Sequence, residues 1–302
     1  MIYLESFRLA SESDEAGYLL SGRTPSNPSP KGHKLDMTCH NVNNPYPFKI
    51  FPFKYLSRLD FAPITLLYGG NGSGKSTLLN IIAQKLKLHR TSPYSRTPFF
   101  EDYLAYCRAE LYREKNPPEG SCIITSDDVF DYMLNFRTLN AGVDRDREAL
   151  IEEWRDLRRG GFQMRSLEDF EELQKRREAW SSTRSEYTAR RLPKNLPGQS
   201  NGENAYGYFA EKIRGDALYL LDEPENSLSA ERQTELAAFL EDSARFYGCQ
   251  FIISTHSPFL LAMKGARIYD LDEIPVTVKK WTELSNVRRY HEFFEAHREE
   301  FE

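Results

Sequence analysis

The stretch Gly69-Gly70-Asn71-Gly72-Ser73-Gly74-Lys75-Ser76-Thr77 decides how this chain folds. It follows the apolar run Ile64–Tyr68 and precedes the apolar segment Leu78–Ala83, which predicts a strand, a tight loop and a helix in that order. Glycines let successive backbone N–H groups point at a phosphate, and the following helix adds the positive end of its dipole. The pattern predicts a phosphate-binding loop, with Lys75 directed at the β- and γ-phosphates and Ser76 at Mg²⁺. A glycine-rich turn without a ligand is the alternative.

The composition is that of a globular protein without membrane spans. Of the 302 residues, 40% are hydrophobic and 28% are charged, and no apolar run approaches the roughly 18 residues that cross a bilayer. The segment Met1–Leu9 alternates like a strand and has no charged leader before an apolar core. We therefore expect no direct membrane insertion and no secretory signal, and we predict a cytoplasmic location.

The cysteine spacing and the net charge bear on whether the chain has a metal site, disulfides or a nucleic-acid-binding surface. Cys39, Cys107, Cys122 and Cys249 are scattered without CxxC spacing, which favours reduced thiols over a zinc site or a disulfide framework. We expect no structural metal. A net charge of -5 gives no global reason to bind nucleic acid, although a local basic patch remains compatible with it.

Segments before the glycine-rich loop read as strands separated by a long connection. Residues 22 to 45 are dense in Pro, Asn, Ser and Gly, which is typical of a loop. Phe48–Phe51 alternates again and predicts another strand, and Leu59–Tyr68 leads into the phosphate-binding loop. Tyr46, Phe48 and Phe51 are candidates for stacking on adenine, but core packing is the commoner role of strand aromatics, and none is assigned.

A helical subdomain is expected after the short apolar strand Cys122–Thr125. Residues 126 to 128 (Ser-Asp-Asp) read as the cap of a helix over Val129–Phe136. Apolar residues at helical spacing follow, before and after the Gly160-Gly161 break: Leu150, Ile151, Trp154 and Leu157, then Leu167, Phe170 and Leu173 behind the possible caps Ser166 and Asp169. With no long heptad array, we expect no long coiled-coil arm. Residues 127–199 are thus predicted as an inserted helical subdomain within a single domain of residues 1–302.

This helical region carries a modest excess of positive charge. Residues 155 to 194 hold eleven basic and seven acidic side chains in a chain whose net charge is -5. A solvated helical face with i, i+4 ion pairs is the simpler interpretation. A surface for nucleic acid or an acidic protein partner is the alternative, with an attraction that weakens as salt rises.

Two carboxylates end a second apolar run, Ala217–Leu221, which suits a central parallel strand. An acid at the end of such a strand can hold Mg²⁺, and an adjacent acid can orient or deprotonate the attacking water. Asp222 and Glu223 fit these two roles. Alone, the pair is equally compatible with a strand followed by a solvated turn, and the phosphate-binding loop upstream favours the functional interpretation.

Two further segments complete the candidate site. Ser200 and Glu203 form an S-x-x-E capping box at a helix start, and with Gly202 beside the cap this start can also bind an anion. The apolar strand Gln250–Thr255 ends at His256. A lone His is usually structural, but one at the end of a core strand after a phosphate-binding loop can contact a γ-phosphate.

The ordered motifs resemble those of ABC-type ATPases: GGNGSGKST as Walker A, QSNGE as the signature, LYLLDEPE as Walker B, ENSLS as the D-loop and STHSPF as the His switch. The motif sequences GxNGSGKST and STHSPFLL resemble those of the stand-alone, SMC/RecF-like branch, often labelled AAA family, more than those of transporter subunits. Residues 268 to 272 and 281 to 283 resemble small members of that branch. The implied fold is α/β, a P-loop NTPase with an ABC-type ATPase head, a mixed central sheet and an inserted helical subdomain.

The resemblance also implies an activity and an assembly. It implies a head-to-tail homodimer in which two ATP molecules are sandwiched, with Mg²⁺ at Ser76 and Asp222. ATP would be held by the Walker A residues Gly69, Gly70, Asn71, Gly72, Ser73, Gly74, Lys75, Ser76 and Thr77. The γ-phosphate bound by the other protomer would be contacted by Ser200, Gly202 and Glu203. Glu223 would be the general base, and His256 would sense the γ-phosphate.

Two positions depart from the family pattern. Ser126 or Asp127 stands where the family usually has the Q-loop Gln, and Ser229 replaces the usual D-loop Asp. The sequence predicts an ATPase that couples closure on ATP to an unidentified protein or nucleic acid, in DNA repair, phage defence or regulation. The alternatives are the nucleotide-binding subunit of an ABC transporter and a nucleotide-dependent switch with negligible turnover.

Overall fold

The computed structural model describes residues 1–21, 24–25, 45–159, 169–192 and 201–301. The chain divides into two compact units, residues 1–129 with 201–302 and residues 130–200. The first unit contains the candidate site, and the second is a helical insertion between residues 129 and 201. We describe each unit separately.

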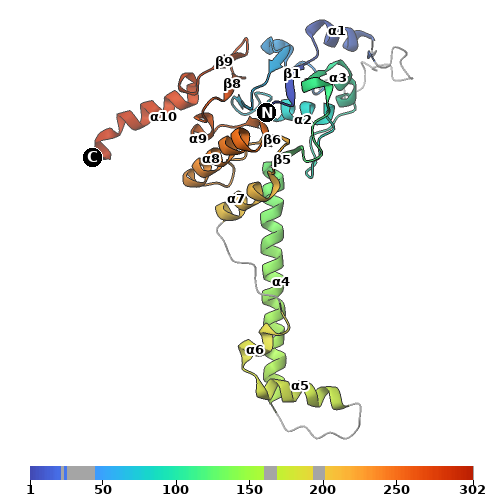
Figure 1. The fold of residues 1–302 in the computed structure, drawn as a ribbon, viewed down its shortest axis with the longest axis vertical. Helices are drawn as coiled ribbons and strands as arrows, with labels where there is room; N and C mark the ends of the chain where they lie inside the picture. Colours follow the sequence, from blue (N-terminus) through green and yellow to red (C-terminus); the bar gives the residue numbers. More distant parts are fainter. Residues whose placement is uncertain (22–23, 26–44, 160–168, 193–200, 302) are drawn as a thin grey trace. The chain divides into compact units, whose positions relative to one another are not determined.

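A six-stranded mixed sheet forms the centre of the first unit, which confirms the predicted α/β fold class (Figure 1). Five strands are parallel and β9 is antiparallel at one edge. All residues of β3 and β7 are buried, because their continuous apolar runs leave no polar face for solvent. The strands run in the order β5 (Cys122–Thr125), β6 (Leu218–Asp222), β7 (Gln250–Ser254), β3 (Ile64–Tyr68), β8 (Arg267–Asp270) and β9 (Thr277–Lys279).

The register of three adjacent strands brings their carboxyl ends together. Asp222 of β6 lies opposite Ser254 of β7, and Ser254 lies opposite Leu67 of β3. Because parallel strands place their following loops at the same edge, the segments after β3, β6 and β7 meet there. These are the three segments that carry the predicted Walker A, Walker B and His-switch residues.

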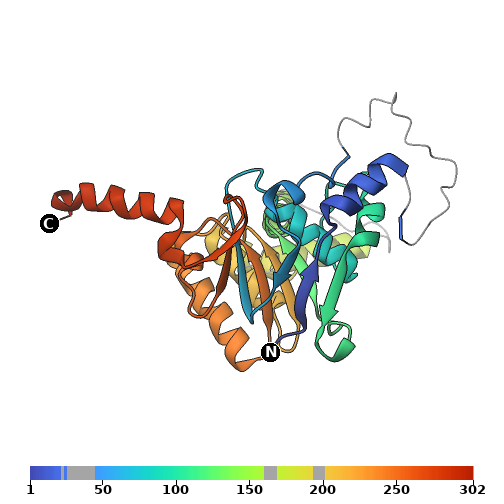
Figure 2. The same cartoon turned by 90° about the horizontal axis from the view of Figure 1, so that it is seen from above.

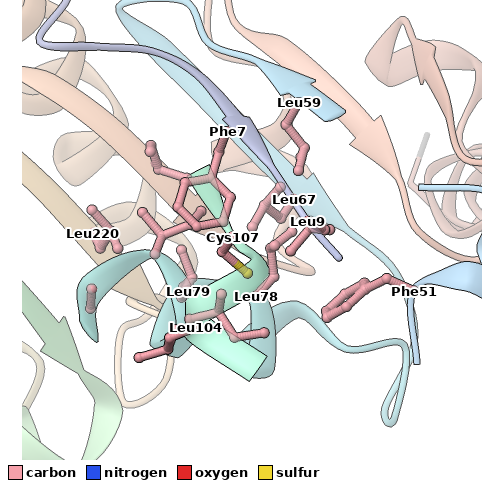
Figure 3. Packing of buried hydrophobic residues seen from close by; sticks show 14 of the residues in the cluster. Phe7, Leu9, Phe51, Leu59, Leu67, Leu78, Leu79, Leu104, Cys107 and Leu220 are labelled. Carbon is pink, nitrogen blue, oxygen red and sulfur yellow. The ribbon is translucent and has the colours of Figure 1, made fainter. Parts of the chain in front are cut away.

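Helices cover the sheet and supply much of the core. The first helix after the phosphate-binding loop, α2, buries Leu78 and Leu79 against Leu67 and Leu220 of the sheet and against Phe7, as the core cluster in Figure 3 shows. Within the described ranges, no helix is long and apolar enough to cross a membrane. The helices of this unit are α1 (Glu12–Ser21), α2 (Lys75–Lys85), α3 (Phe100–Tyr106), α7 (Asn201–Lys212), α8 (Ala230–Phe246), α9 (Pro258–Leu261) and α10 (Ser285–Ala296).

A smaller antiparallel sheet of β2 (Arg58–Asp60), β1 (Leu4–Arg8) and β4 (Arg108–Leu111) packs beside the central one. The fully buried side chain of Gln250 links the two sheets. Its Oε1 accepts from the backbone N–H groups of Tyr3 and Leu4 at 2.7 and 2.9 Å, and its Nε2 donates to the Leu4 carbonyl at 2.9 Å. The amide thus satisfies backbone groups at the N-terminal start of β1 that its pairing with β4 leaves unbonded.

The predicted strand over Phe48–Phe51 is wrong, because residues 46 to 51 form turns and a bend. Phe48 and Phe51 are buried, so the alternation reflects core contacts of a turn rather than a pleated strand. Lys49 has a left-handed φ of 66°, which breaks any extended ladder, and its N–H donates to Glu15 Oε2 at 2.7 Å. A side chain of α1 therefore replaces the strand partner that the pattern implied.

The second unit contains most of a long helix, α4 (Ser126–Arg158), with α5 (Phe170–Ser181) and α6 (Arg184–Ala189). The sequence predicts separate helices near Val129–Phe136 and before Gly160, whereas α4 is one helix of 33 residues. Nothing between these segments stops a helix, since no proline interrupts it and Gly142 faces open space. A second helix of comparable length is absent from the described part of this unit, so the structure shows no paired coiled-coil arm.

The cap of α4 uses one residue of the predicted Ser126-Asp127-Asp128 cap, Asp128, together with Thr125 before it. The cap is a reciprocal pair in which Asp128 Oδ2 accepts from the Thr125 N–H at 2.7 Å and the Asp128 N–H donates to Thr125 Oγ1 at 3.4 Å. The helix is therefore capped by the last residue of β5 and not by Ser126. Of the caps expected for the next helix, Ser166 lies outside the described residues, and Asp169 precedes α5 without a side-chain cap bond.

Several arginines of the second unit hold its helices together. Arg176 pairs with Glu172 at 3.0 Å and donates to the Leu157 carbonyl at 3.1 Å, and Glu178 receives Arg190 and Arg191 at 3.7 and 2.7 Å. These contacts surround a small core that contains Leu157, Ala179 and Tyr187. Part of the predicted basic surplus therefore has an internal structural role.

Burial of Glu15 in α1 predicts a pH-dependent stability. Desolvation raises the pKa of Glu15 from 4.5 to about 7, and its Oε1 has no hydrogen-bond partner among the described residues. Because the folded state favours the protonated form, the free energy of unfolding should fall as pH rises from 4.5 to about 7 and stay level above that range.

The variant Glu15→Gln should remove that fall and raise the free energy of unfolding at pH 8 by about 2 to 3 kcal/mol. Denaturant titrations at several pH values measure both effects. The matched control is Glu12→Gln, an exposed glutamate of the same helix, which should keep the wild-type pH profile. Equal profiles for the two variants would contradict this role of Glu15.

Candidate nucleotide-binding site

The predicted phosphate-binding loop connects β3 to α2 and has the required tight backbone. Gly74, the N-cap residue of α2, has a φ of 97°, and a Cβ there would lie 3.2 Å from Ile50 Cγ2. A Cβ on Gly69 would lie 2.7 Å from Ser73 Oγ. Both positions therefore need glycine. The hydroxyl of Ser73 is buried and has no partner among the described residues, which leaves a polar atom within the loop for a ligand to satisfy.

The three predicted catalytic side chains come together at this loop. Lys75 is only 4% exposed, and its Nζ donates to the Gly69 carbonyl at 2.7 Å. Nζ also lies 2.8 Å from His256 Nε2 and 3.7 Å from Glu223 Oε1, and His256 Nε2 lies 3.4 Å from the same carboxylate oxygen. A buried ammonium next to a carboxylate and an imidazole provides a cationic centre with a base beside it.

Two oxygen ligands suited to Mg²⁺ face each other beside Lys75. Ser76 Oγ donates to Asp222 Oδ1 at 3.0 Å, and the Ser254 hydroxyl donates to the same oxygen. Burial raises the pKa of Asp222, although both hydroxyl donors oppose that shift. A hydroxyl and a carboxylate are hard oxygen ligands, and Mg²⁺ is usually bound by one or two such groups together with phosphate and water. The residues therefore fit the metal that the sequence predicts.

The backbone holds Glu223 in an uncommon conformation. Its φ is 49°, in the left-handed region that costs a non-glycine residue free energy. Its N–H donates to the Ser254 carbonyl at 3.0 Å and lies 3.1 Å from Ser254 Oγ, while Asn226 Nδ2 donates to Glu223 Oε2 at 3.2 Å. These contacts turn the carboxylate toward Lys75 and His256, as needed for a base beside a phosphate.

Glu225 is a further residue of the site that the motif analysis did not single out. Its Oε1 accepts from Thr255 Oγ1 at 2.8 Å and from the N–H groups of His256 and Ser257 at 2.6 and 3.2 Å. This carboxylate therefore fixes the loop that presents the imidazole. Burial raises the pKa of Glu225, whereas the hydrogen bonds from the His256 N–H and the Thr255 hydroxyl act in the opposite direction. The sequence signal was a third acid, separated from the Asp222-Glu223 pair by Pro224 and contained in the Walker B and D-loop segments.

Asp272, which follows β8, also contacts the phosphate-binding loop. Its Oδ1 and Oδ2 lie 2.9 and 2.7 Å from the backbone N of Gly70, which donates to the carboxylate. The contact joins residues 202 positions apart, so no local pattern could have predicted it.

The position expected for the Q-loop lies beside the metal ligands. A pocket of about 420 Å³ is lined by both candidate replacements, Ser126 and Asp127, and by Asp222. Arg90 lines the same pocket, donates to Asn80 Oδ1 at 2.9 Å and lies over the Tyr94 ring at 4.3 Å. The structure thus adds a cation at this pocket, and Arg90 was absent from the sequence prediction.

Of the three aromatic candidates for adenine, Tyr46 has a suitable position. It lines a pocket of about 590 Å³ together with Ser76, Thr77 and Arg96, and its hydroxyl donates to Thr77 Oγ1 at 3.2 Å. Phe48 and Phe51 are buried in the core and belong to its packing. The pocket adjoins the start of α2, where a phosphate group can bind.

The predicted signature segment is only partly described. Ser200 lies outside the described residues, and Gly202 is known only as a helical position of α7. Glu203 forms an ion pair with Arg232 of α8 at 3.3 Å. Ser229, at the D-loop position, caps α8 by accepting from the Arg232 N–H at 3.3 Å. The contact of the signature with another protomer's nucleotide stays a prediction.

Comparison with known proteins places these motifs in context. Residues 196–262 match the family model described as "AAA domain, putative AbiEii toxin, Type IV TA system". No curated protein sequence matches the chain. The matched residues include the predicted signature, Walker B and His-switch segments. The match confirms the resemblance over these 67 of 302 residues, and the chain has the fold of a P-loop NTPase with ABC-type motifs.

Solved structures with a similar fold are distant in sequence. The Smc head domain with an extended coiled coil from Pyrococcus furiosus, bound to the C-terminal domain of ScpA, is 14% identical, with 80% of this chain and 95% of that chain covered and a TM-score of 0.36. A dimeric ATP-binding cassette in a post-hydrolysis state with ADP and Pi is 17% identical, with 74% and 88% covered and a TM-score of 0.35. At these values, neither structure assigns an activity or an assembly to this chain.

The contacts of Glu225 predict that it holds the His256 loop. Replacing Glu225 by Ala leaves three donors without their acceptor and should lower the free energy of unfolding by about 3 kcal/mol. Amide hydrogen exchange of the peptide containing residues 254 to 258 should also speed up, because the N–H groups of His256 and Ser257 lose their bonds. The control is Glu231→Ala, an exposed glutamate of α8. Unchanged exchange in Glu225→Ala would refute the assignment.

Proposed function

We propose that this protein is an Mg²⁺-dependent ATPase that binds ATP at the loop Gly69–Thr77 and hydrolyses it. The observation that carries the proposal is the convergence of Lys75, Glu223 and His256, with Lys75 Nζ 2.8 Å from the imidazole and 3.7 Å from the carboxylate. Each of these residues lies in the segment that follows a different strand: Lys75 after β3, Glu223 after β6 and His256 after β7. An arrangement of a buried cation, a base and a polar sensor at a phosphate-binding loop suits phosphoryl transfer.

Each side chain has a chemical role in this proposal. Lys75 exchanges its carbonyl partners for the β- and γ-phosphate oxygens, which are stronger acceptors because they are charged. Ser76 and Asp222 hold Mg²⁺, which when bound offsets the phosphate charge. Glu223 orients the attacking water and accepts its proton, and His256, beside Lys75, contacts the γ-phosphate. Tyr46 and Arg96 border the space for ribose and adenine.

We further propose that ATP closes two copies into a head-to-tail homodimer. Ser200, Gly202 and Glu203 of one copy would contact the γ-phosphate held by Lys75 and Ser76 of the other. Support comes from the motif order of the ABC-type resemblance and from the family match, which begins at residue 196 and includes this segment. Opening after hydrolysis would then transmit the cycle to a partner.

The proposals for the partner and the cellular process rest on exposed charges of the second unit and on the description of the matched family. Exposed basic side chains remain on the second unit, including Lys175 and Arg177, and an acidic protein or nucleic acid would suit them. The description of the matched family names a toxin of a toxin–antitoxin system, which favours phage defence over the alternative of a transporter's nucleotide-binding subunit. A cytoplasmic protein is in keeping with this function.

Separate variants test the base and the cation. Glu223→Gln should reduce turnover by about 10²- to 10⁴-fold while ATP still binds, because the amide cannot accept a proton and the phosphate cradle is intact. Lys75→Ala should lose both affinity and turnover. Phosphate release and equilibrium binding of a fluorescent ATP analogue measure these quantities, with Glu231→Gln on α8 as the control. Wild-type turnover in Glu223→Gln would remove Glu223 from its role.

The sandwich dimer is tested in the Glu223→Gln background, where bound ATP persists. Adding ATP should produce a change in sedimentation coefficient, and the additional change Gly202→Asp should abolish it, because a carboxylate repels the γ-phosphate across the interface. ATP binding itself should remain. The matched control is Gly207→Asp on the same helix, where a side chain meets open space. An unchanged ATP-dependent shift in the Gly202→Asp variant would exclude the proposed contact.

A further inference from the structure

The C-terminal helix α10 projects from the rest of the first unit (Figures 1 and 2). Most of its residues are exposed. Within the helix only Val287 is buried. Its aromatic side chains are largely in solvent: Tyr290, Phe293 and Phe294 are 44%, 56% and 53% exposed, and Phe301 beyond the helix is 72% exposed. A contiguous row of exposed aromatic rings is unusual on a soluble surface and marks an interaction site.

One side of α10 forms the wall of a hollow. Val287, Tyr290, His291 and Phe294 recur at i, i+3, i+4 and i+7, and all four line a cavity of about 1000 Å³. The opposite wall comes from the segment after β7, including Pro258 and Phe259. An apolar groove next to an amphipathic helix is the shape that accepts a second helix.

The charges of α10 run against its helix dipole. Arg288 and Arg289 lie in the N-terminal half, where a helix favours acids, and Glu292 and Glu295 lie toward the C-terminal end, where it favours bases. Glu299 and Glu300 extend the acidic end in the next turn. Local ion pairs at that end join Arg298 to Glu295 at 3.3 Å and His297 to Glu300 at 2.7 Å. Counting these pairs, residues 292 to 300 carry four acids and one arginine. An isolated helix would gain from the reverse arrangement, so the helix dipole does not account for these charges.

We propose that α10 pairs antiparallel with α10 of a second copy of this chain, across a twofold axis and without nucleotide. In that orientation the basic half of each helix meets the acidic half of the other, and the two helix dipoles oppose each other favourably. The aromatic side chains of the second helix enter the hollow. A twofold axis makes both halves of the interface equivalent, so a single self-complementary surface suffices.

The charge pattern selects this occupant over the alternatives. A parallel pair would place arginines beside arginines and glutamates beside glutamates, which repel. A uniformly acidic or basic partner would match only one half of the helix. A second α10 matches both halves.

Sedimentation velocity of the full chain in EDTA, without nucleotide and at low salt, tests the pairing. We expect a particle of twice the 35.1 kDa of one chain. Phe294→Asp should convert it to a monomer, because the aspartate would have to be buried in the hollow. Phe246→Asp, at an exposed aromatic on the end of α8, is the matched control and should remain dimeric. Circular dichroism confirms that each variant is folded.

Charge exchange tests the orientation. Arg288→Glu with Arg289→Glu makes both halves acidic and should give a monomer. Separately, Glu295→Arg with Glu299→Arg removes the acidic excess that Arg288 and Arg289 would meet and should also give a monomer. Mixing the two variants should restore a dimer. The chain with all four changes should again dimerise with itself but not with wild type, because only an antiparallel pair has this complementarity.

Each outcome decides the proposal. A monomeric wild type at concentrations up to about 100 µM, or a Phe294→Asp variant that remains dimeric, would overturn the pairing. A four-change variant that associates with wild type would overturn the antiparallel orientation. Because all measurements exclude ATP and Mg²⁺, failure of the proposed ATPase or of its ATP-dependent dimer would leave these results unaffected.

Discussion

The parallel register of β3, β7 and β6 is the constraint on which the rest of the site depends. In this register Leu67 and Asp222 both lie opposite Ser254, so the three segments that follow these strands begin at the same edge of the sheet. Lys75 can then contact His256, and Ser76 can contact Asp222, although each pair is far apart in sequence. A shift of one residue in any strand would turn its side chains to the other face and separate these partners.

Ser254 has a central part in this geometry. Its hydroxyl donates to Asp222, and its carbonyl accepts the N–H of Glu223, which has a left-handed φ. One residue of β7 therefore orients both acids of the neighbouring strand end. The cost of the left-handed conformation, of order 1 to 3 kcal/mol, is met because the adjacent strands are buried and fixed. Such stored strain is typical of functional sites, and here it directs Glu223 toward Lys75.

Sequence reasoning succeeds where the determining pattern is local. The glycine-rich loop and the buried runs before Asp222 and His256 can be read directly, since glycine and continuous apolar residues have few structural solutions. Glu225 and Asp272 could not be found this way, because their partners lie about 30 and 200 residues away. Phe48–Phe51 is a case in which a local pattern misled the prediction. Apolar and polar residues alternate there because a turn buries two phenyl rings, not because the segment is a strand. The Lys49 N–H bonds to the Glu15 side chain instead of to a neighbouring strand.

Glu225 links the proposed nucleotide site to the hollow beside α10. One oxygen holds the His256 loop, the other has no partner among the described residues, and the same side chain lines the hollow with His256 and Ser257. Oε2 is itself buried, so a second helix in the hollow would not change the solvation of this carboxylate. It would instead contact the same wall that Glu225 fixes to the His256 loop through Oε1. Pairing through α10 would thus reach the His256 loop through packing, without any contact to the phosphate-binding loop itself.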